Sequence, residues 1–202
     1  MNIVRPPQML RSLYRDSLWR MDKTRPELYL TFDDGPIPGL TPWVLDVLKD
    51  YQAKATFFCV GDNIRKNGNI FERVLAEGHQ VGNHTYNHLK GWKTKTADYL
   101  HNAGLCQQYT QTALFRPPYG RIKKSQYRAL KQHYTMVFWD VLSYDYDRFT
   151  PPETCLQNVI KYTRNGSIIL FHDNIKAEQN IKFALPRFLE HSLKLNYTFT
   201  RL

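Results

Sequence analysis

The sequence predicts an α/β fold in which parallel strands alternate with outer helices. Seven apolar, strand-like runs alternate with about six helix-like segments along 202 residues. Parallel strands need crossover connections, which helices supply. The runs are almost continuously apolar, as expected for strands buried on both faces. An open doubly wound sheet and a distorted barrel both accommodate seven strands, and the chain length suits one domain.

The first half of the chain contains three of these strands, and each element has a recognisable end. Residues 28–34 are a strand that Gly35-Pro36 ends, and Thr41 begins a helix because Thr is a good N-cap and the following Pro suits the first turn. Residues 55–60 are a β-rich apolar run. Residues 69–77 form a helix that a glycine stops, and a short strand follows over residues 79–83.

The second half repeats the same alternation. A helix over residues 96–111 leads to a strand at residues 113–116, which a double proline ends. Residues 123–133 are helical because Tyr127, Leu130 and Tyr134 recur at helical spacing. The remaining expected elements are strands over residues 135–142, 167–171 and 197–200 and helices over residues 151–165 and 176–195.

An N-terminal extension, residues 1–26, stands apart from the predicted domain at residues 27–202. Within it, residues 9–21 form a basic amphipathic helix whose apolar side chains share one face; these are Leu10, Leu13, Tyr14, Leu18 and Met21. We expect this helix to pack against the core or to close one end of a barrel. A helix lying on a membrane surface is the alternative.

The net charge is +10, from 28 basic and 18 acidic side chains. A solvated surface explains this charge most simply, and attraction of the basic N-terminal region to an anionic polymer or a membrane surface is the sharper hypothesis. No nucleic-acid partner is expected, because no binding motif is present. The N-terminus lacks the apolar core of a signal peptide. As written, the chain is therefore expected to be cytoplasmic or membrane-associated, or to belong to the cell envelope if the N-terminus is incomplete.

Ionisable residues follow five of the predicted strands. They are Asp33-Asp34, His84, Arg116, Asp145 and His172. The carboxyl ends of parallel strands share one rim, where α/β folds build their active sites. Structural need alone does not explain so many charged groups at one rim, so this edge is the predicted active site.

The double aspartate and the pair His84 and His88 predict a metal site. Two buried adjacent carboxylates need compensation, and a cation supplies it. Two histidines four residues apart can present both rings to one ion. Two imidazoles and one carboxylate leave a coordination position open, as in catalytic zinc sites. The second aspartate is then available as a general base.

Five segments in this order resemble the signature motifs of the polysaccharide deacetylases, the NodB-homology or family 4 carbohydrate esterases. The segments are Thr31-Phe32-Asp33-Asp34-Gly35, His84-Thr85-Tyr86-Asn87-His88, Arg116-Pro117-Pro118-Tyr119-Gly120, Trp139 to Tyr146, and Leu170-Phe171-His172. The resemblance covers about residues 28–202. It implies a distorted (β/α)7 barrel and hydrolysis of the N-acetyl group of N-acetylglucosamine-type units in a polysaccharide, peptidoglycan or related glycan.

The resemblance also implies a role for each matched residue. Asp34, His84 and His88 would hold a divalent metal, usually Zn²⁺, with Co²⁺ or Ni²⁺ as alternatives. Asp33 would be the base, restrained by Arg116, and His172 the acid, supported by Asp145. The backbone N–H of Tyr119 would stabilise the oxyanion. The expected substrate-binding residues are Tyr119, Tyr146, Leu170 and Pro118 of the motifs. Trp92, which follows the metal-binding turn and lies outside the motifs, is a further candidate because its ring could stack on a sugar.

Two positions depart from the family pattern. Members often carry Asp where this chain has Leu142 and Trp where it has Tyr146. Both departures concern the substrate range rather than the metal ligands, the base or the acid. The alternatives are hydrolysis of another acylated small molecule or of an O-acetyl ester at the same site, and a non-catalytic, metal-containing sugar-binding module.

Overall fold

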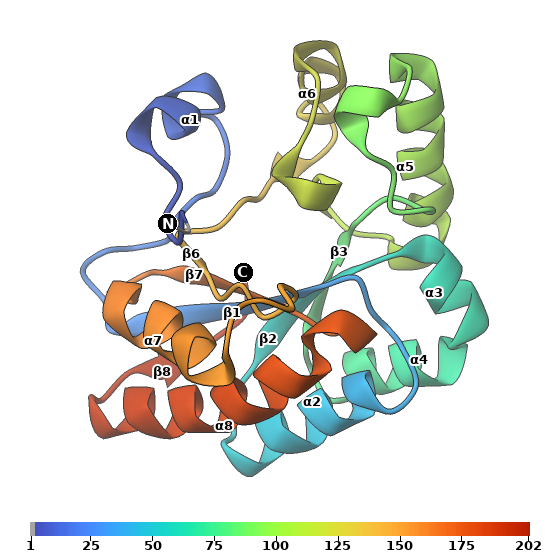
Figure 1. Ribbon diagram of the computed structural model, residues 1–202. Coiled ribbons are helices and arrows are strands. Elements are labelled where there is room, and N and C mark those ends of the chain that lie inside the picture. Colours follow the sequence, from blue (N-terminus) through green and yellow to red (C-terminus); the bar gives the residue numbers. More distant parts are fainter. Residues whose placement is uncertain (1–2) are drawn as a thin grey trace.

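A curled sheet of parallel strands forms the centre of the molecule (Figure 1). The computed structural model describes residues 3–202. In these residues the strands follow the order β5-β4-β3-β2-β1-β7-β6, and β8 pairs with the beginning of β1. Their bounds are β1 Glu27–Asp33, β2 Ala55–Cys59, β3 Gln80–Asn83, β4 Leu114–Phe115, β5 Thr135–Met136, β6 Val141–Leu142, β7 Ile168–His172 and β8 Thr198–Phe199. Every pair is parallel, as the alternation predicted.

Helices cover the outside of this sheet. Figure 1 shows α2, α4 and α8 along one side and α3 and α5 beside β3. The main helices are α1 Gln8–Leu13, α2 Leu40–Asp50, α3 Gly61–Lys66, α4 Gly68–Ala76, α5 Thr96–Thr110, α6 Lys124–Leu130, α7 Pro152–Tyr162 and α8 Glu178–Lys194. Short 3-10 turns are η1 Gly91–Lys93, η2 Pro118–Gly120 and η3 Ile175–Ala177. Within residues 3–202 no helix is long and apolar enough to cross a bilayer.

The predicted strand over residues 135–142 is wrong as one element. It divides into β5 and β6, which lie at opposite edges of the sheet. The intervening residues cross the open side of the barrel, where the N-terminal segment meets them: Leu18 donates to Met136 O at 2.8 Å and accepts from Phe138 N at 2.8 Å. A backbone that must turn across this gap cannot stay in one regular ladder, although its apolar sequence favours a strand.

The predicted N-terminal helix is also shorter than expected. It ends at Leu13 because Tyr14 leaves the helical conformation, with φ −129° and ψ 49°. Leu10 and Leu13 remain 37% and 58% exposed, so the expected apolar face is not buried as one stripe. The segment is held instead through the fully buried Asp140, whose Oδ1 lies 2.7 Å from Arg11 Nη2. Backbone pairing and this ion pair replace the helix packing that the periodicity predicted.

Three smaller differences concern the helices. The cap of α2 is Gly39 rather than Thr41, because the Thr41 hydroxyl donates to Asp173 at 2.7 Å and accepts from Ile37 N. The helix α3 was not predicted, since only Ile64 and Gly61 of its six residues are buried. The helix α7 ends at Tyr162, before the expected Asn165-Gly166 stop.

Candidate active site

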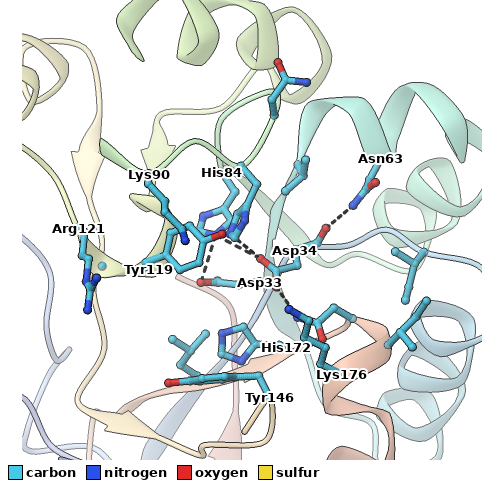
Figure 2. A pocket seen from close by; sticks show the side chains of 18 of the residues that line it. Asp33, Asp34, Asn63, His84, Lys90, Tyr119, Arg121, Tyr146, His172 and Lys176 are labelled. Atoms are coloured by element: carbon cyan, nitrogen blue, oxygen red, sulfur yellow. Dashed lines mark hydrogen bonds and ion pairs between the residues drawn. The ribbon is translucent and has the colours of Figure 1, made fainter. Parts of the chain in front are cut away.

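A cleft of about 780 Å³ lies at the carboxyl ends of the central strands (Figure 2). The parallel register places Asp33 directly opposite His172 on the neighbouring strand, and it places the loop after β3 on the other side of β2. The shared rim predicted from the sequence is therefore present. Eight predicted site residues line the cleft: Asp33, Asp34, His84, His88, Tyr119, Tyr146, Leu170 and His172.

Asp34, His84 and His88 form a cluster that could hold a metal ion. One ligand atom from each lies within 4.8 Å of the others. Asp34 Oδ1 is 3.6 Å from His84 Nε2 and 3.0 Å from His88 Nε2. Asp34 and His88 both adopt a positive φ, at 89° and 54°, as the chain turns sharply to aim these side chains inward. This strain is of the kind that functional sites retain.

The chemical state of the cluster fits a divalent cation. The backbone carbonyl of Arg116 lies 2.8 Å from His84 Nδ1, so a proton on Nδ1 leaves the Nε2 lone pair facing Asp34. Burial lowers the pKa of His84 to about 4, which keeps its imidazole neutral. Asp34 Oδ1 is buried and makes no hydrogen bond within residues 3–202. Although burial opposes ionisation, the imidazoles of His88 and His172 hold the pKa of Asp34 well below its usual value. An ionised oxygen aimed at two imidazole nitrogens is an appropriate ligand set for a metal.

Two asparagines position Asp34, and neither was among the site residues predicted from the sequence. Asn174 Nδ2 donates to Asp34 Oδ2 at 2.5 Å, which leaves Oδ1 for the cluster. Asn63 Nδ2 donates to the Asp34 backbone carbonyl at 2.7 Å. Asn174 follows β7 by two residues, so its place at the carboxyl end of a strand was the available signal. Asn63 lies in the unpredicted α3 and gave no such signal.

Asp33 is bound to Arg116 deep beneath the cleft. Asp33 Oδ1 accepts from Arg116 Nη1 at 2.7 Å, and the arginine is completely buried. The guanidinium also donates to Thr31 Oγ1 and to the Phe138 carbonyl, each at 2.8 Å, and lies 4.1 Å from the centre of the Phe58 ring. Since one carboxylate edge is fixed by a cation, the other is oriented toward the cleft and the His84 ring, 3.6 Å away.

His172 and Asp145 form a second, partly buried ion pair in the cleft. Asp145 is fully buried, and its Oδ1 lies 2.8 Å from His172 Nδ1. The same carboxylate accepts from the Ser143 hydroxyl at 2.9 Å and from His172 N at 2.6 Å. Burial alone lowers the pKa of an imidazole, but the Asp145 carboxylate outweighs it and raises the pKa of His172 to about 9. In the metal-free protein His172 is therefore a cation at neutral pH.

The predicted substrate-binding residues separate into two groups. Tyr119, Tyr146 and Leu170 line the cleft together with Leu142, and burial raises the pKa of Tyr146 to about 12. Pro118 is buried and Trp92 is 59% exposed, and neither belongs to the lining. Trp92 lies instead at the rim, 5.1 Å beneath the Arg121 guanidinium. Arg121 was not predicted, and two further unpredicted cations, Lys90 and Lys176, also line the cleft.

Comparisons with known proteins agree with this geometry. A family model described as polysaccharide deacetylase matches residues 20–137. A peptidoglycan-N-acetylglucosamine deacetylase of Bacillus cereus is 34% identical over 188 residues, covering 90% of this chain and 88% of that protein. A chitooligosaccharide deacetylase of Rhizobium leguminosarum bv. phaseoli is 30% identical, covering 84% and 76%. Some relatives are longer, and the chain spans 33% to 55% of their length.

The fold has a similar counterpart among solved structures. A peptidoglycan N-acetylglucosamine deacetylase in complex with 4-naphthalen-1-yl-N-oxidanyl-benzamide superposes with a TM-score of 0.85 and 30% identity, covering 95% of this chain and 94% of that one. The distorted (β/α)7 barrel implied by the motifs is thus confirmed. Family model, relatives and fold all agree with the five ordered motifs, so the chain belongs to the polysaccharide deacetylase family.

Proposed function

We propose that this protein is a metal-dependent hydrolase that removes the N-acetyl group from N-acetylglucosamine-type units of a glycan and releases acetate. The single observation that carries the proposal is the convergence of three groups in one cleft: a metal-ligand cluster, the Asp33–Arg116 pair and the His172–Asp145 pair. The names of the relatives, which act on peptidoglycan or on chitooligosaccharide, support an N-acetylated glycan as the substrate.

Asp34, His84 and His88 would hold the cation. Zn²⁺ is the proposed ion because it favours two imidazoles and a carboxylate with an open position, with Co²⁺ and Ni²⁺ as substitutes. When bound, such an ion supplies Lewis-acid polarisation of the amide carbonyl and lowers the pKa of water.

Asp33 serves as the general base. It takes a proton from the attacking water, whose oxygen forms a bond to the amide carbonyl carbon. Arg116 fixes one edge of the carboxylate at 2.7 Å, so the other edge keeps its orientation toward the cleft. The base is thereby pre-positioned, which lowers the entropic cost of reaching the transition state.

His172 serves as the general acid. The amide nitrogen is a poor leaving group until it is protonated, and the imidazolium held by Asp145 supplies that proton as the carbon–nitrogen bond breaks. The products are acetate and the free amine of the sugar. Asp145 is a positioning residue here, because it acts through His172.

The remaining lining residues fit an acetyl group beside these two pairs. The backbone N–H of Tyr119 is the proposed oxyanion donor, on the 3-10 turn η2 that follows β4, and removing such a donor typically costs about 3 kcal/mol in the transition state. Leu170 and Tyr146 form the wall for the acetyl methyl, where Leu142 adds apolar surface.

An acetate-release assay tests the proposal. Purified protein loaded with Zn²⁺ or Co²⁺ should release acetate from N-acetylglucosamine oligomers or peptidoglycan fragments. Asp33→Asn should lose at least about 100-fold in kcat while retaining the metal, since a positioned base contributes about 100- to 10,000-fold. Wild-type turnover that persists after the metal has been stripped would contradict the proposal.

Two alternatives remain distinguishable in the same assay. Release of acetate from O-acetyl esters but not from amides would favour an esterase. Binding of glycan without turnover would favour a sugar-binding module, although such a module has no need for a positioned base and acid. Both pairs are intact here, with ion-pair distances of 2.7 and 2.8 Å.

A further inference from the structure

The cleft carries cations that the reaction does not use. Lys90, Arg121 and Lys176 line it, and they come from the loops after β3, β4 and β7. Figure 2 shows Lys90 and Arg121 beside Tyr119, with Lys176 on the other side of the two aspartates. An N-acetyl group is neutral, so the chemistry of deacetylation itself gives no reason for these charges.

The acidic residues of the cleft do not neutralise these cations. Asp33 is paired with Arg116, and Asp34 belongs to the metal cluster. Asp62 is paired with Arg65 at 3.0 Å and Lys66 at 2.5 Å. Within residues 3–202, no carboxylate forms an ion pair with Lys90, Arg121 or Lys176. The cleft is therefore left with excess positive charge that faces an incoming substrate.

Aromatic rings hold two of these cations near the wall of the cleft. The Arg121 guanidinium lies 5.1 Å from the Trp92 ring centre, and Lys90 Nζ lies 4.9 Å from the Tyr119 ring centre. Trp92 is itself fixed, because its Nε1 donates to the Ile122 carbonyl at 3.1 Å. Stacking restrains a cation without cancelling its charge, so both remain able to bind an anion.

We propose that Lys90 and Arg121 form an anion subsite, and that the glycan carries a carboxylate or phosphate on a sugar close to the N-acetylglucosamine unit. This inference rests on the proposed function and specifies its substrate class as an anionic rather than a neutral glycan. The Arg121 guanidinium can bind either anion through two parallel hydrogen bonds, and Lys90 adds a second charge.

Matched substrates test the subsite. The wild-type enzyme would be assayed at low salt with four fragments of equal length: a neutral N-acetylglucosamine oligomer, a peptidoglycan glycan carrying free carboxylates, the same glycan with its carboxylates amidated, and a phosphorylated oligomer. We expect kcat/KM to be about tenfold higher for the fragment with the preferred anion, and we expect this advantage to shrink as salt rises. The carboxylate and phosphate fragments separate the two sources of charge.

Charge-removing variants locate the effect. Lys90→Gln and Arg121→Gln should each erase much of the advantage, because they should lower kcat/KM for the anionic fragment far more than kcat/KM for the neutral oligomer. The matched controls are Lys93→Gln on the adjacent turn and Arg128→Gln on α6, both exposed and outside the cleft. Both controls should keep the kcat/KM advantage of the anionic fragment. Equal kcat/KM on neutral and anionic fragments, or an advantage that survives in the Lys90→Gln, Arg121→Gln double variant, would overturn the inference.

A binding measurement separates this inference from the proposed function. If no fragment releases acetate, the deacetylase proposal fails, but titration calorimetry with the same four fragments still reports the subsite. Tighter binding of an anionic fragment that depends on Lys90 and Arg121 would support it. Equal affinities for neutral and anionic fragments would reject it.

Discussion

The floor of the cleft and its rim are built on opposite principles. On the floor, Asp33 and Asp145 are buried, and each is bonded to a cation; Asp145 also accepts from the Ser143 hydroxyl and from His172 N. At the rim, Lys90 and Arg121 are exposed and rest on aromatic faces. Buried charges must be paired because their desolvation costs free energy, whereas the charges at the rim stay hydrated and need no partner. The paired residues of the floor are therefore suited to the reaction, and the unpaired cations of the rim are suited to substrate specificity.

The largest expected effect comes from breaking a pair on the floor. Arg116→Met leaves the Asp33 carboxylate buried without its cation and removes donors from Thr31 and Phe138. We expect the free energy of unfolding to fall by about 3–5 kcal/mol, the usual result of removing one partner of a buried pair. Urea unfolding of the metal-free protein measures it. The exposed control Arg128→Met on α6 should change stability by less than about 0.5 kcal/mol, and an equal loss in both variants would contradict the contrast between buried and exposed charges.

The second pair on the floor, Asp145 and His172, determines the protonation of the His172 imidazole. In metal-free protein, Asp145 and the nearby Asp33 and Asp34 raise the pKa of His172 from 6.5 to about 9. Because the folded-state pKa is raised, this pair stabilises the fold fully below about pH 6.5, and the contribution disappears as the pH rises through about 9. In Asp145→Asn, only the more distant charges of Asp33 and Asp34 still oppose burial, so the pKa of His172 should fall by about one unit or more, with each unit equal to about 1.4 kcal/mol.

Histidine NMR titration of metal-free wild type and Asp145→Asn measures this shift. Unfolding at pH 6 and pH 9.5 should show a loss of stability in the wild type that the variant lacks. A His172 pKa that is unchanged in Asp145→Asn would show that Asp145 is not the source of the shift.

A smaller effect is expected from the residue that orients a metal ligand. Asn174→Ala removes the hydrogen bond of 2.5 Å to Asp34 Oδ2, and Asp34 can then rotate away from His84 and His88. We expect metal affinity to fall about 10- to 100-fold, as is typical when a partner of a ligand is lost. Competition titration with a chelating dye measures it independently of turnover. Asn69→Ala, an exposed asparagine on α4 outside the cleft, is the control and should keep the wild-type affinity, and equal affinities in wild type and Asn174→Ala would refute the positioning role.

The same division between floor and rim separates the site residues that the sequence predicts from those that it does not. Floor residues lie in ordered motifs at strand ends, so Asp33, Asp34, His84, His88, Arg116, Asp145 and His172 could all be named in advance. The cations of the rim could not, because Arg121 follows a motif without belonging to it and Lys90 lies two residues beyond another motif. The role of such a cation depends on which carboxylates of the cleft are already paired, and that is a property of the fold.

The fold shows a comparable limit. Local periodicity identified the long, buried strands β1, β2 and β7 to within about a residue at most ends. It failed where distant segments decide the conformation. Residues 135–142 divide because the barrel must be crossed there, and the first helix ends early because Leu18 pairs with Met136 and Phe138. Both changes depend on contacts between segments far apart in the chain, which local periodicity cannot predict.

The smallest expected effect is at Trp92, and it separates two roles for the rim. Trp92→Ala should change the free energy of unfolding by less than about 1 kcal/mol, because the side chain is 59% exposed and loses one hydrogen bond. If Trp92 stacks on the sugar, KM should rise several-fold for neutral and anionic fragments alike. If it acts by holding Arg121, KM should rise for the anionic fragment only, and Trp92→Phe, which keeps an aromatic face, should restore most of the affinity. Steady-state kinetics on both fragments decides between the two, and an unchanged KM for both would remove Trp92 from substrate binding altogether.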